Sequence, residues 1–354
     1  MASMIPAGDF RNSYRADTTI FPTIGSRVAL WIGIALLCCA PLVFGRYEMG
    51  LLIAIGYSAI AALGLNILVG FTGQISIGHA AFFGFGAFAS ALIHEWGVPV
   101  ALCIWLAGIA TALIGLVFGA PAARLKGLYL AIATLAAQFI LEDFFARARW
   151  FSGGVAGRIT EPYTLFGYRF DTEHSYFYVV LAHLIIMFLA AANLMRTRDG
   201  RALIAVRDHY LSAEIMGINL AYYRTLSFGI ASFFAGVAGA LYGHYLLFVS
   251  VEAFNILYSI QFLAMVIIGG LGSVMGSLMG AAFMVVLPEF VQMLANLLTG
   301  SALDRALRIG ASVSHLREMT IGATIILFLI FEPDGLAHRW RMIKAYWKLY
   351  PYSH

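Results

Sequence analysis

Long apolar runs separated by short polar breaks constrain this chain more than any other feature of its sequence. A helix needs about 20 mostly apolar residues to cross the hydrocarbon core of a bilayer. The sequence therefore predicts an all-α polytopic membrane protein with about ten transmembrane helices, some of them broken or re-entrant. The predicted spans are residues 28–45, 49–70, 77–94, 98–119, 128–146, 176–195, 225–248, 253–270, 274–298 and 318–332.

The overall composition agrees with a membrane protein and excludes several other classes. Of the 354 residues, 61% are hydrophobic and 11% are charged, whereas soluble domains carry about 25% charged residues. The polar N-terminal residues lack the short apolar core and cleavage site of a signal peptide, so we expect the first span to be retained. The formal net charge of +4 gives no basis for binding nucleic acid. The three cysteines lie in apolar runs without metal-ligand spacing, and we expect them to be packing residues.

The orientation in the membrane follows from the distribution of positive charge. An even number of spans places both termini on one side, and cytoplasmic connections carry an excess of Lys and Arg. With both termini inside, the inner segments hold fourteen of the 22 Lys and Arg residues, including all three lysines. The sequence thus predicts a cytoplasmic N-terminal segment 1–27, a transmembrane domain 28–332 and a cytoplasmic tail 333–354. Within the domain, we expect loop 196–224 to be cytoplasmic and the long connection 147–175 to face outward.

One strongly polar stretch interrupts the apolar chain near its middle. Residues 196–217 read RTRDGRALIAVRDHYLSAEIMG, and their apolar positions recur every three to five residues from Leu203 to Met216. This spacing predicts a short amphipathic helix, which Gly217 ends because glycine tolerates positive φ. The pattern alone fits a solvated surface helix as well as a helix that docks a partner protein.

Two glycine-rich breaks interrupt the spans elsewhere. Residues 70–78 read GFTGQISIG and residues 269–276 read GGLGSVMG. Irregular backbone at membrane depth is tolerated only where protein or a water-filled cavity satisfies its polar groups. We therefore predict that these breaks line or gate a pathway. Small residues at four-residue spacing also predict close helix contacts: Gly115 and Gly119; Gly239 and Gly243; Gly272, Gly276 and Gly280.

Polar and aromatic residues near these breaks are the candidates for the pathway lining. Carboxylates are scarce in the spans, which disfavours a proton- or sodium-coupled carrier and favours a neutral, zwitterionic or apolar solute. Each candidate could instead serve as an interhelical hydrogen bond or packing contact. They are Asn66, Gly73, Gln74, Ser76, Gly78, His79, Phe82, Phe83, Gln138, Gln261, Gly269, Gly270, Gly272 and Ser273.

Enzyme motifs are missing from the sequence. His94-Glu95 is not followed by a second histidine at metalloprotease spacing, and no GxSxG elbow is present. No glycine is directly followed by lysine, so the chain cannot contain the phosphate-binding P-loop. We therefore expect no catalytic residue, metal or cofactor in this chain. If transport is powered by ATP and Mg, these belong to another polypeptide.

The residues of the first break carry a family resemblance. The stretch Ala62 to Leu92, ALGLNILVGFTGQISIGHAAFFGFGAFASAL, resembles the signature of bacterial branched-chain amino acid ABC transporter permeases of the LivM type. Further segments resemble the same family in the same order, so that the resemblance covers about residues 50–336. These segments are Pro121–Thr134, Ser152–Gly154, Arg207–Asn219, Phe234–Pro288 and Glu332–Leu336.

The resemblance implies an importer subunit in the bacterial cell inner membrane. It implies as partners a second related permease, two cytoplasmic ABC ATPase subunits that bind ATP and Mg, a soluble solute-binding protein and membrane lipid. The outer connection 147–175 would dock the binding protein, and the polar stretch would be the coupling helix that docks in an ATPase subunit. The residues implied for that contact are Arg207, Asp208, Leu211, Glu214, Ile215, Met216 and Gly217.

Some segments depart from the family pattern. Residues 135–145 read LAAQFILEDFF, which shifts or alters the usual motif, and neither the first 27 residues nor the tail after Trp340 resembles the family. Relatives also transport urea, short amides and aromatic acids, so these solutes stay open as alternatives. A stand-alone secondary carrier, a membrane-embedded enzyme and a receptor or scaffold are the alternative classes.

Overall fold

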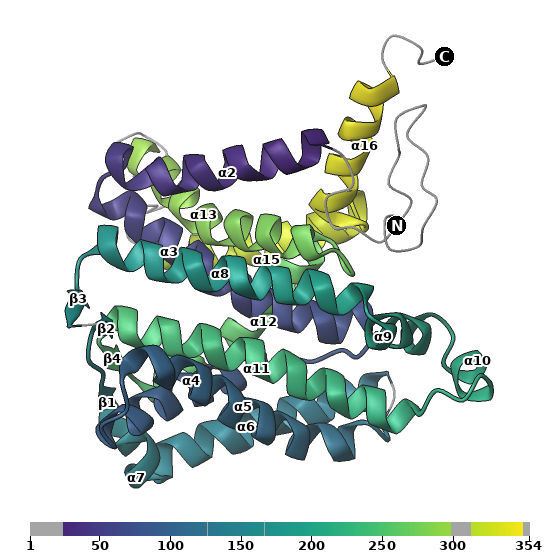
Figure 1. The fold of residues 1–354 in the computed structure, drawn as a ribbon, viewed down its shortest axis with the longest axis horizontal. Helices are drawn as coiled ribbons and strands as arrows, with labels where there is room; N and C mark the ends of the chain where they lie inside the picture. Colours follow the sequence, from purple (N-terminus) through teal and green to yellow (C-terminus); the bar gives the residue numbers. More distant parts are fainter. Residues whose placement is uncertain (1–23, 126, 166, 299–312, 350–354) are drawn as a thin grey trace.

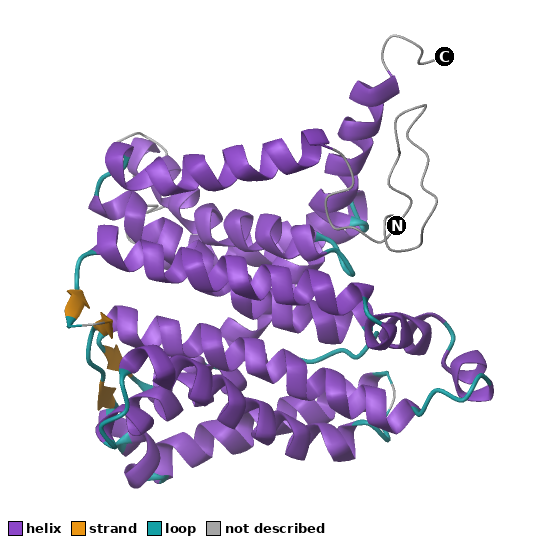
Figure 2. Ribbon diagram, in the orientation of Figure 1, coloured by secondary structure: helices purple, strands orange, loops and turns teal. Residues whose placement is uncertain are grey.

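Helices joined by short loops make up almost the whole chain in a computed structural model, which describes residues 24–125, 127–165, 167–298 and 313–349. Short strands lie at one end (Figure 1, Figure 2). The first half contains α2 (Ile24–Val43), α3 (Arg46–Asn66), η1 (Ile67–Phe71), α4 (His79–Glu95), α5 (Val100–Ala122), α6 (Leu128–Arg147), α7 (Arg149–Ser152), η2 (Gly154–Ala156), β1 (Arg158–Ile159), β2 (Tyr163–Leu165) and β3 (Tyr168–Phe170). The second half contains α8 (Glu173–Arg196), α9 (Arg198–Asp208), α10 (Tyr210–Ile215), α11 (Leu220–Leu246), β4 (Phe248–Val249), η3 (Val251–Phe254), α12 (Ile256–Gly269), α13 (Val274–Leu298), α15 (Val313–Phe331) and α16 (Gly335–Leu349).

The membrane-protein class is confirmed, but the number of spans is not. Among the described residues, six helices are long and apolar enough to cross a membrane, or seven if the bent pair α15 and α16 is one span. Shorter apolar helices cover residues 30–43 and 256–269. Each of the ten predicted runs lies on a helix, yet several of these helices are too short for the 20-residue criterion. About ten spans and two cytoplasmic termini therefore remain predictions.

Parts of the predicted terminal segments lie outside the described residues. These parts are 1–23 of segment 1–27 and 350–354 of tail 333–354. Five of the cations used for the orientation also lie outside them, namely Arg11, Arg15, Lys126, Arg305 and Arg308.

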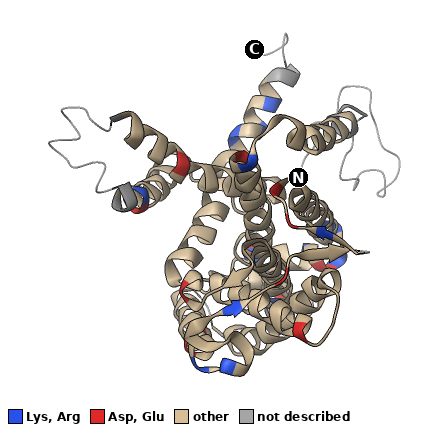
Figure 3. Ribbon diagram, turned by 90° about the vertical axis from the view of Figure 1, so that its left-hand side faces the viewer, with Lys and Arg blue, Asp and Glu red and all other residues tan. Residues whose placement is uncertain are grey.

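The long helices lie side by side and give the molecule two distinct ends. The strands lie at one end, and α9 and α10 lie at the other (Figure 1). Helix α2 begins, and α16 lies, at the end that carries α9 and α10. Charged residues are few, and most of the ribbon is uncharged when the strand end faces the viewer (Figure 3). At that end β1 pairs antiparallel with β4, and β2 pairs antiparallel with β3.

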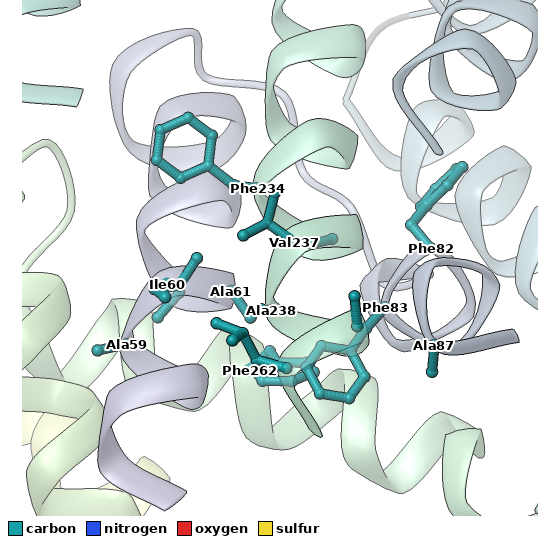
Figure 4. Packing of buried hydrophobic residues seen from close by; sticks show 14 of the residues in the cluster. Ala59, Ile60, Ala61, Phe82, Phe83, Ala87, Phe234, Val237, Ala238 and Phe262 are labelled. Atoms are coloured by element: carbon teal, nitrogen blue, oxygen red, sulfur yellow. The ribbon is translucent and has the colours of Figure 1, made fainter. Parts of the chain in front are cut away.

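Helix α11 occupies the centre of the core and packs against α3, α4 and α5. Aromatic rings fill the space beside it: the ring centroid of Phe83 lies 5.3 Å from those of Tyr242 and Phe262 (Figure 4). Phe83 and Phe262 are fully buried. Such tilted aromatic contacts add to the stabilisation from burial alone.

The predicted close contacts at small residues are confirmed. A Cβ at Gly115 would lie 2.2 Å from Ser232 Oγ on α11, and one at Gly280 would lie 1.8 Å from the Met265 carbonyl oxygen on α12. The absence of side chains therefore lets these backbones approach one another.

Replacing Gly239 by Val is expected to destabilise the fold strongly. A Cβ there would lie 1.8 Å from the carbonyl oxygen of Phe83, a backbone atom fixed in α4. Overpacking a core costs about 1–3 kcal/mol, and a backbone clash belongs at the upper end of that range. The thermal unfolding midpoint of the purified variant in detergent measures the effect. Gly322→Val is the matched control, because a Cβ at Gly322 meets nothing within 4 Å; equal losses in both variants would contradict the importance of this close contact.

Candidate functional site

The polar stretch predicted as one helix is two helices, so that prediction is wrong. Helix α9 ends at Asp208 and α10 begins at Tyr210. Between them His209 has φ −156° and ψ 86°, outside the helical region. Its Nδ1 accepts hydrogen bonds from the backbone N–H and the hydroxyl of Ser212, so the imidazole caps the first turn of α10. A capping side chain at this position stops α9 and restarts the chain in a new direction.

The two helices use their apolar residues differently. Leu203 and Val206 of α9 are 0% and 4% exposed, and α9 packs against α8 and α11. In contrast, Ile215 and Met216 at the end of α10 are 85% and 82% exposed. Helix α9 is thus anchored in the body of the protein, while α10 presents an uncovered apolar tip (Figure 1). Leu211 belongs to the same tip and is 51% exposed.

The end of α10 has the predicted glycine termination. Gly217 has φ +86°, which side chains other than glycine rarely adopt. Its N–H donates to the Glu214 carbonyl, and the N–H of Ile218 donates to the Ala213 carbonyl. These two bonds satisfy carbonyls that the helix end would otherwise leave unpaired.

A surface pocket of about 510 Å³ lies beside α10. Glu214, Arg124 and Arg224 all line it, so both signs of charge surround one concavity. The guanidinium of Arg224 also donates to the Ala123 carbonyl at 3.2 Å, which joins α11 to the end of α5. The apolar tip and this charged pocket together form one surface, which we call the α10 surface.

Arg207 points away from the α10 surface and toward the glycine breaks. Its Nη1 donates a hydrogen bond of 2.7 Å to the carbonyl oxygen of Gly70, and its guanidinium pairs with Asp208 at 2.8 Å. A Cβ at Gly73 would lie 2.9 Å from Arg207 Cγ, and one at Gly272 would lie 2.9 Å from Nη1. The Arg207 side chain therefore contacts both glycine breaks and links them to α9.

The two glycine breaks lie against each other around Asn66, the last residue of α3. Its Nδ2 donates to the Ser273 carbonyl and to Ser277 Oγ, each at 2.8 Å, and its Oδ1 accepts from the N–H of Gly272 at 2.9 Å. The following residues form the π-helix η1, a rare geometry that is frequent at functional sites. Both predicted breaks are therefore real interruptions, and one buried amide joins them.

The remaining predicted lining residues are mostly used in packing. Gln138 accepts from the N–H of Ala81 and the hydroxyl of Ser259, and it donates to the Phe254 carbonyl. His79 Nε2 lies 3.0 Å from the Ala61 carbonyl oxygen. Phe82 lies edge-on to Phe118, Gln261 is partly buried, and Gly78 approaches the backbone of Thr134. Gly269 and Gly270 approach Gly276 and Asp334 respectively. Direct contact of any of these residues with a solute remains a prediction.

Two buried polar atoms next to the first break have no partner among the described residues. They are Gln74 Oε1 and Ser76 Oγ. Buried polar groups are normally hydrogen-bonded, so such atoms point to a place that takes up water or a polar ligand group. Gln74 Nε2 is held by Ser227 Oγ at 2.6 Å, which fixes the direction of the amide. Of the lining candidates, these two have the strongest structural support.

Sequence reasoning missed several partners of these residues. The serines at 227, 259 and 277, together with the link from Arg207 to Gly70, join segments more than a hundred residues apart. Single hydroxyls in apolar runs gave no periodic signal that could have identified them. Among the described residues, no group of three His, Cys, Asp or Glu side chains could hold a metal ion.

The connection 147–175, predicted to face outward, lies at the strand end. Arg158 donates to Glu95 at 2.9 Å and to the Phe151 carbonyl at 2.7 Å, which ties the connection to the end of α4. Val155 and Ile159 are 77% and 79% exposed on it. The connection therefore presents a fixed surface at the end opposite α10.

Comparisons with known proteins agree on one family. The model of a family described as branched-chain amino acid transport system / permease component matches residues 48–329. The high-affinity branched-chain amino acid transport system permease protein LivM of Salmonella typhimurium is 30% identical over 303 residues, which cover 78% of this chain and 67% of that protein. The protein of the same name from Escherichia coli gives the same values. A probable branched-chain amino acid transport permease protein LivM from Methanocaldococcus jannaschii is 27% identical over 236 residues, covering 66% of this chain and 67% of that protein. No solved structure matches the chain.

Proposed function

Because the chain belongs to the family of branched-chain amino acid transport permease components, we propose that it is a permease subunit of an ATP-binding-cassette importer for these amino acids. It is a multi-pass protein of the bacterial inner membrane. In this proposal the chain forms half of the translocation pathway, and a second permease forms the other half. Two cytoplasmic ATPase subunits hydrolyse ATP, and a soluble binding protein delivers the solute from outside.

The observation that carries the proposal is the contrast between α9 and α10. Ile215 and Met216 are more than four-fifths exposed on a helix tip outside the apolar bundle, and together they offer an apolar patch to a partner protein. The adjoining pocket adds Glu214, Arg124 and Arg224 as polar contacts at its rim. Apolar groups surrounded by charged ones are the usual anatomy of a protein interface. An ATPase subunit is the partner that the family membership supplies for this surface.

Movement of α10 would reach the pathway through a short chain of contacts. Helix α10 continues into α9, α9 carries Arg207, and Arg207 binds the Gly70 carbonyl in the first break. Asn66 then connects that break to Gly272 and Ser273 in the second. Glycines and irregular backbone let helices bend or slide at these points. We infer alternating access, in which a push on α10 changes the arrangement of both breaks.

The topology in this proposal has ten crossings with both termini in the cytoplasm. Short helices such as α12 cross with fewer than 20 residues, because buried protein contacts can satisfy the backbone at their ends. The excess of Lys and Arg in the inner connections supports this orientation. The α10 surface is then cytoplasmic, and the connection 147–175 offers its exposed residues to the binding protein.

Charge reversal at the α10 surface tests the proposal. We expect Glu214→Arg to abolish uptake of radiolabelled leucine, because it places a third cation at the rim that already holds Arg124 and Arg224. Asp208→Arg should do the same by repelling Arg207 from its present position. Membrane insertion should be unchanged in both. Normal uptake by both variants would contradict the assignment.

A further inference from the structure

The C-terminal helix α16 has a composition unlike the rest of the chain. Residues 335–349 read GLAHRWRMIKAYWKL and contain four Lys or Arg residues but no Asp or Glu. Two of the three lysines of the chain, Lys344 and Lys348, belong to this one helix. Basic amphipathic helices with aromatic residues are typical of segments that lie on membrane surfaces.

The first turn of α16 is fixed to the protein. Ala337 is buried, and Gly335 has φ +72°. A Cβ at Gly335 would lie only 2.6 Å from the Gly270 Cα atom, so the two backbones are in close contact. Arg339 pairs with Glu332 at 2.5 Å, so its charge is offset. These contacts anchor the start of the helix against the second glycine break.

The later turns of α16 have few contacts of this kind, and the one hydrogen bond of Arg341 runs from its Nε to the Ala337 carbonyl oxygen of the same helix, at 3.3 Å. Trp340, Ile343 and Tyr346 are 53%, 50% and 63% exposed. Arg341 and Lys344 are also exposed, and neither forms an ion pair with any described residue. The two cations lie three residues apart on one face of the helix, and Trp340 and Ile343 lie three apart on the adjoining face. The helix therefore carries a basic face next to an apolar face.

The direction of α16 fits a position along the membrane surface. The helix is bent by 48° from the end of α15. It rises across the direction of the long helices at the end that carries α9 and α10, and it stands off from the bundle in the second view as well (Figure 1, Figure 3). At this end of a spanning bundle, a helix that leaves the bundle sideways enters the interfacial layer of the bilayer.

We propose that α16 lies on the inner surface of the bilayer and binds anionic phospholipid headgroups through Arg341 and Lys344. Trp340, Ile343 and Tyr346 enter the boundary between headgroups and acyl chains. The occupant is a lipid surface because the free charge on this helix is wholly positive and because aromatic and aliphatic groups adjoin it. Phosphate oxygens accept from both cationic side chains. Since the helix starts against Gly270, lipid also holds the second break at a fixed depth. This inference rests on the proposed orientation of the chain, but it does not depend on the solute or on the ATPase contact.

Lipid retention by the purified full-length chain tests the proposal. Native mass spectrometry would count the phosphatidylglycerol and phosphatidylcholine molecules that stay bound when both are offered in equal amounts. The variant is Arg341→Gln/Lys344→Gln. A juxtamembrane cation contributes an affinity factor of about fivefold, so we expect the preference for phosphatidylglycerol to fall by about fivefold per charge removed. Added salt should reduce the preference of the unaltered chain.

Two further variants make the result specific. Arg46→Gln/Arg147→Gln removes two exposed arginines from the opposite end and should keep the preference. Arg341→Lys/Lys344→Arg conserves the charge and should also keep it, which separates a lost charge from a misfolded helix. Unchanged retention in the Gln variant would overturn the proposal. So would an equal loss in the control. Loss of a bound ATPase subunit with lipid retention intact would assign α16 to a protein partner instead.

Discussion

Replacing Ile215 and Met216 together by Asp is expected to release the ATPase subunits from this chain and to abolish uptake. Both side chains are almost fully exposed at the tip of α10, so the substitutions leave the fold itself intact. Burying a side chain of this size contributes about 1.5–3 kcal/mol, and every 1.4 kcal/mol changes an affinity tenfold. Losing two such contacts and burying two carboxylates should weaken the complex by more than about a hundredfold. Co-purification of the ATPase subunits and leucine uptake measure the two effects.

The matched control changes two residues of similar size and exposure at the other end. Val155→Asp/Ile159→Asp alters the outer connection, where these side chains are 77% and 79% exposed. This variant should retain the ATPase subunits. Retention of the subunits by the α10 variant, or equal loss from both variants, would contradict the docking role of α10.

Replacing Arg207 by Met is expected to leave the ATPase subunits bound but to uncouple ATP hydrolysis from transport. The variant keeps an unbranched, somewhat shorter side chain and removes the bonds to the Gly70 carbonyl and to Asp208. A hydrogen bond to a charged group contributes about 1.5–3 kcal/mol, so uptake should fall by about 10- to 100-fold. The measurement is the amount of solute moved per ATP hydrolysed in proteoliposomes that contain the complete assembly.

Arg198→Gln is the control for this prediction, because it removes the same charge from an exposed position on the same helix α9. It should transport normally. If Arg207→Met loses the ATPase subunits, Arg207 belongs to the docking surface as the sequence predicted. If Arg207→Met transports normally, the contact between Arg207 and the Gly70 carbonyl does not couple ATP hydrolysis to transport.

The positions of helix ends and breaks that contain glycine were predicted well from the sequence. Gly217 ends α10 with positive φ, and both glycine-rich stretches interrupt the helices. These features depend on backbone conformations that mainly glycine allows, so the residue type carries the information. The close contacts at Gly239 and Gly280 could be predicted for the same reason.

Features that depend on particular side-chain hydrogen bonds could not be predicted in this way. The spacing of apolar residues from Leu203 to Met216 gave a single helix, because periodicity does not reveal that His209 caps a new one. Arg207 was assigned to the partner contact, although its side chain turns inward to Gly70. Gln138 is predicted to line the pathway, and the sequence did not show that its amide also links three other segments. In each case the contact is a side-chain hydrogen bond that leaves no periodic pattern in the sequence.

The number of spans shows the same limit. Length and hydropathy identify helices such as α5 and α8 without tertiary information, whereas α12 has only 14 residues. Buried neighbours around the second break can satisfy the ends of such a helix. Length and composition alone therefore do not decide whether a helix such as α12 crosses the membrane.

Purification of this chain from its native membrane in mild detergent tests the central claim most directly. All co-purifying polypeptides would be identified by mass spectrometry, and the sample would be assayed for ATP hydrolysis. We expect a second permease and P-loop ATPase subunits in the sample, with hydrolysis activity. A chain that purifies alone, hydrolyses no ATP and transports solute in proteoliposomes on an ion gradient would contradict the proposed function and would assign the chain to the secondary carriers.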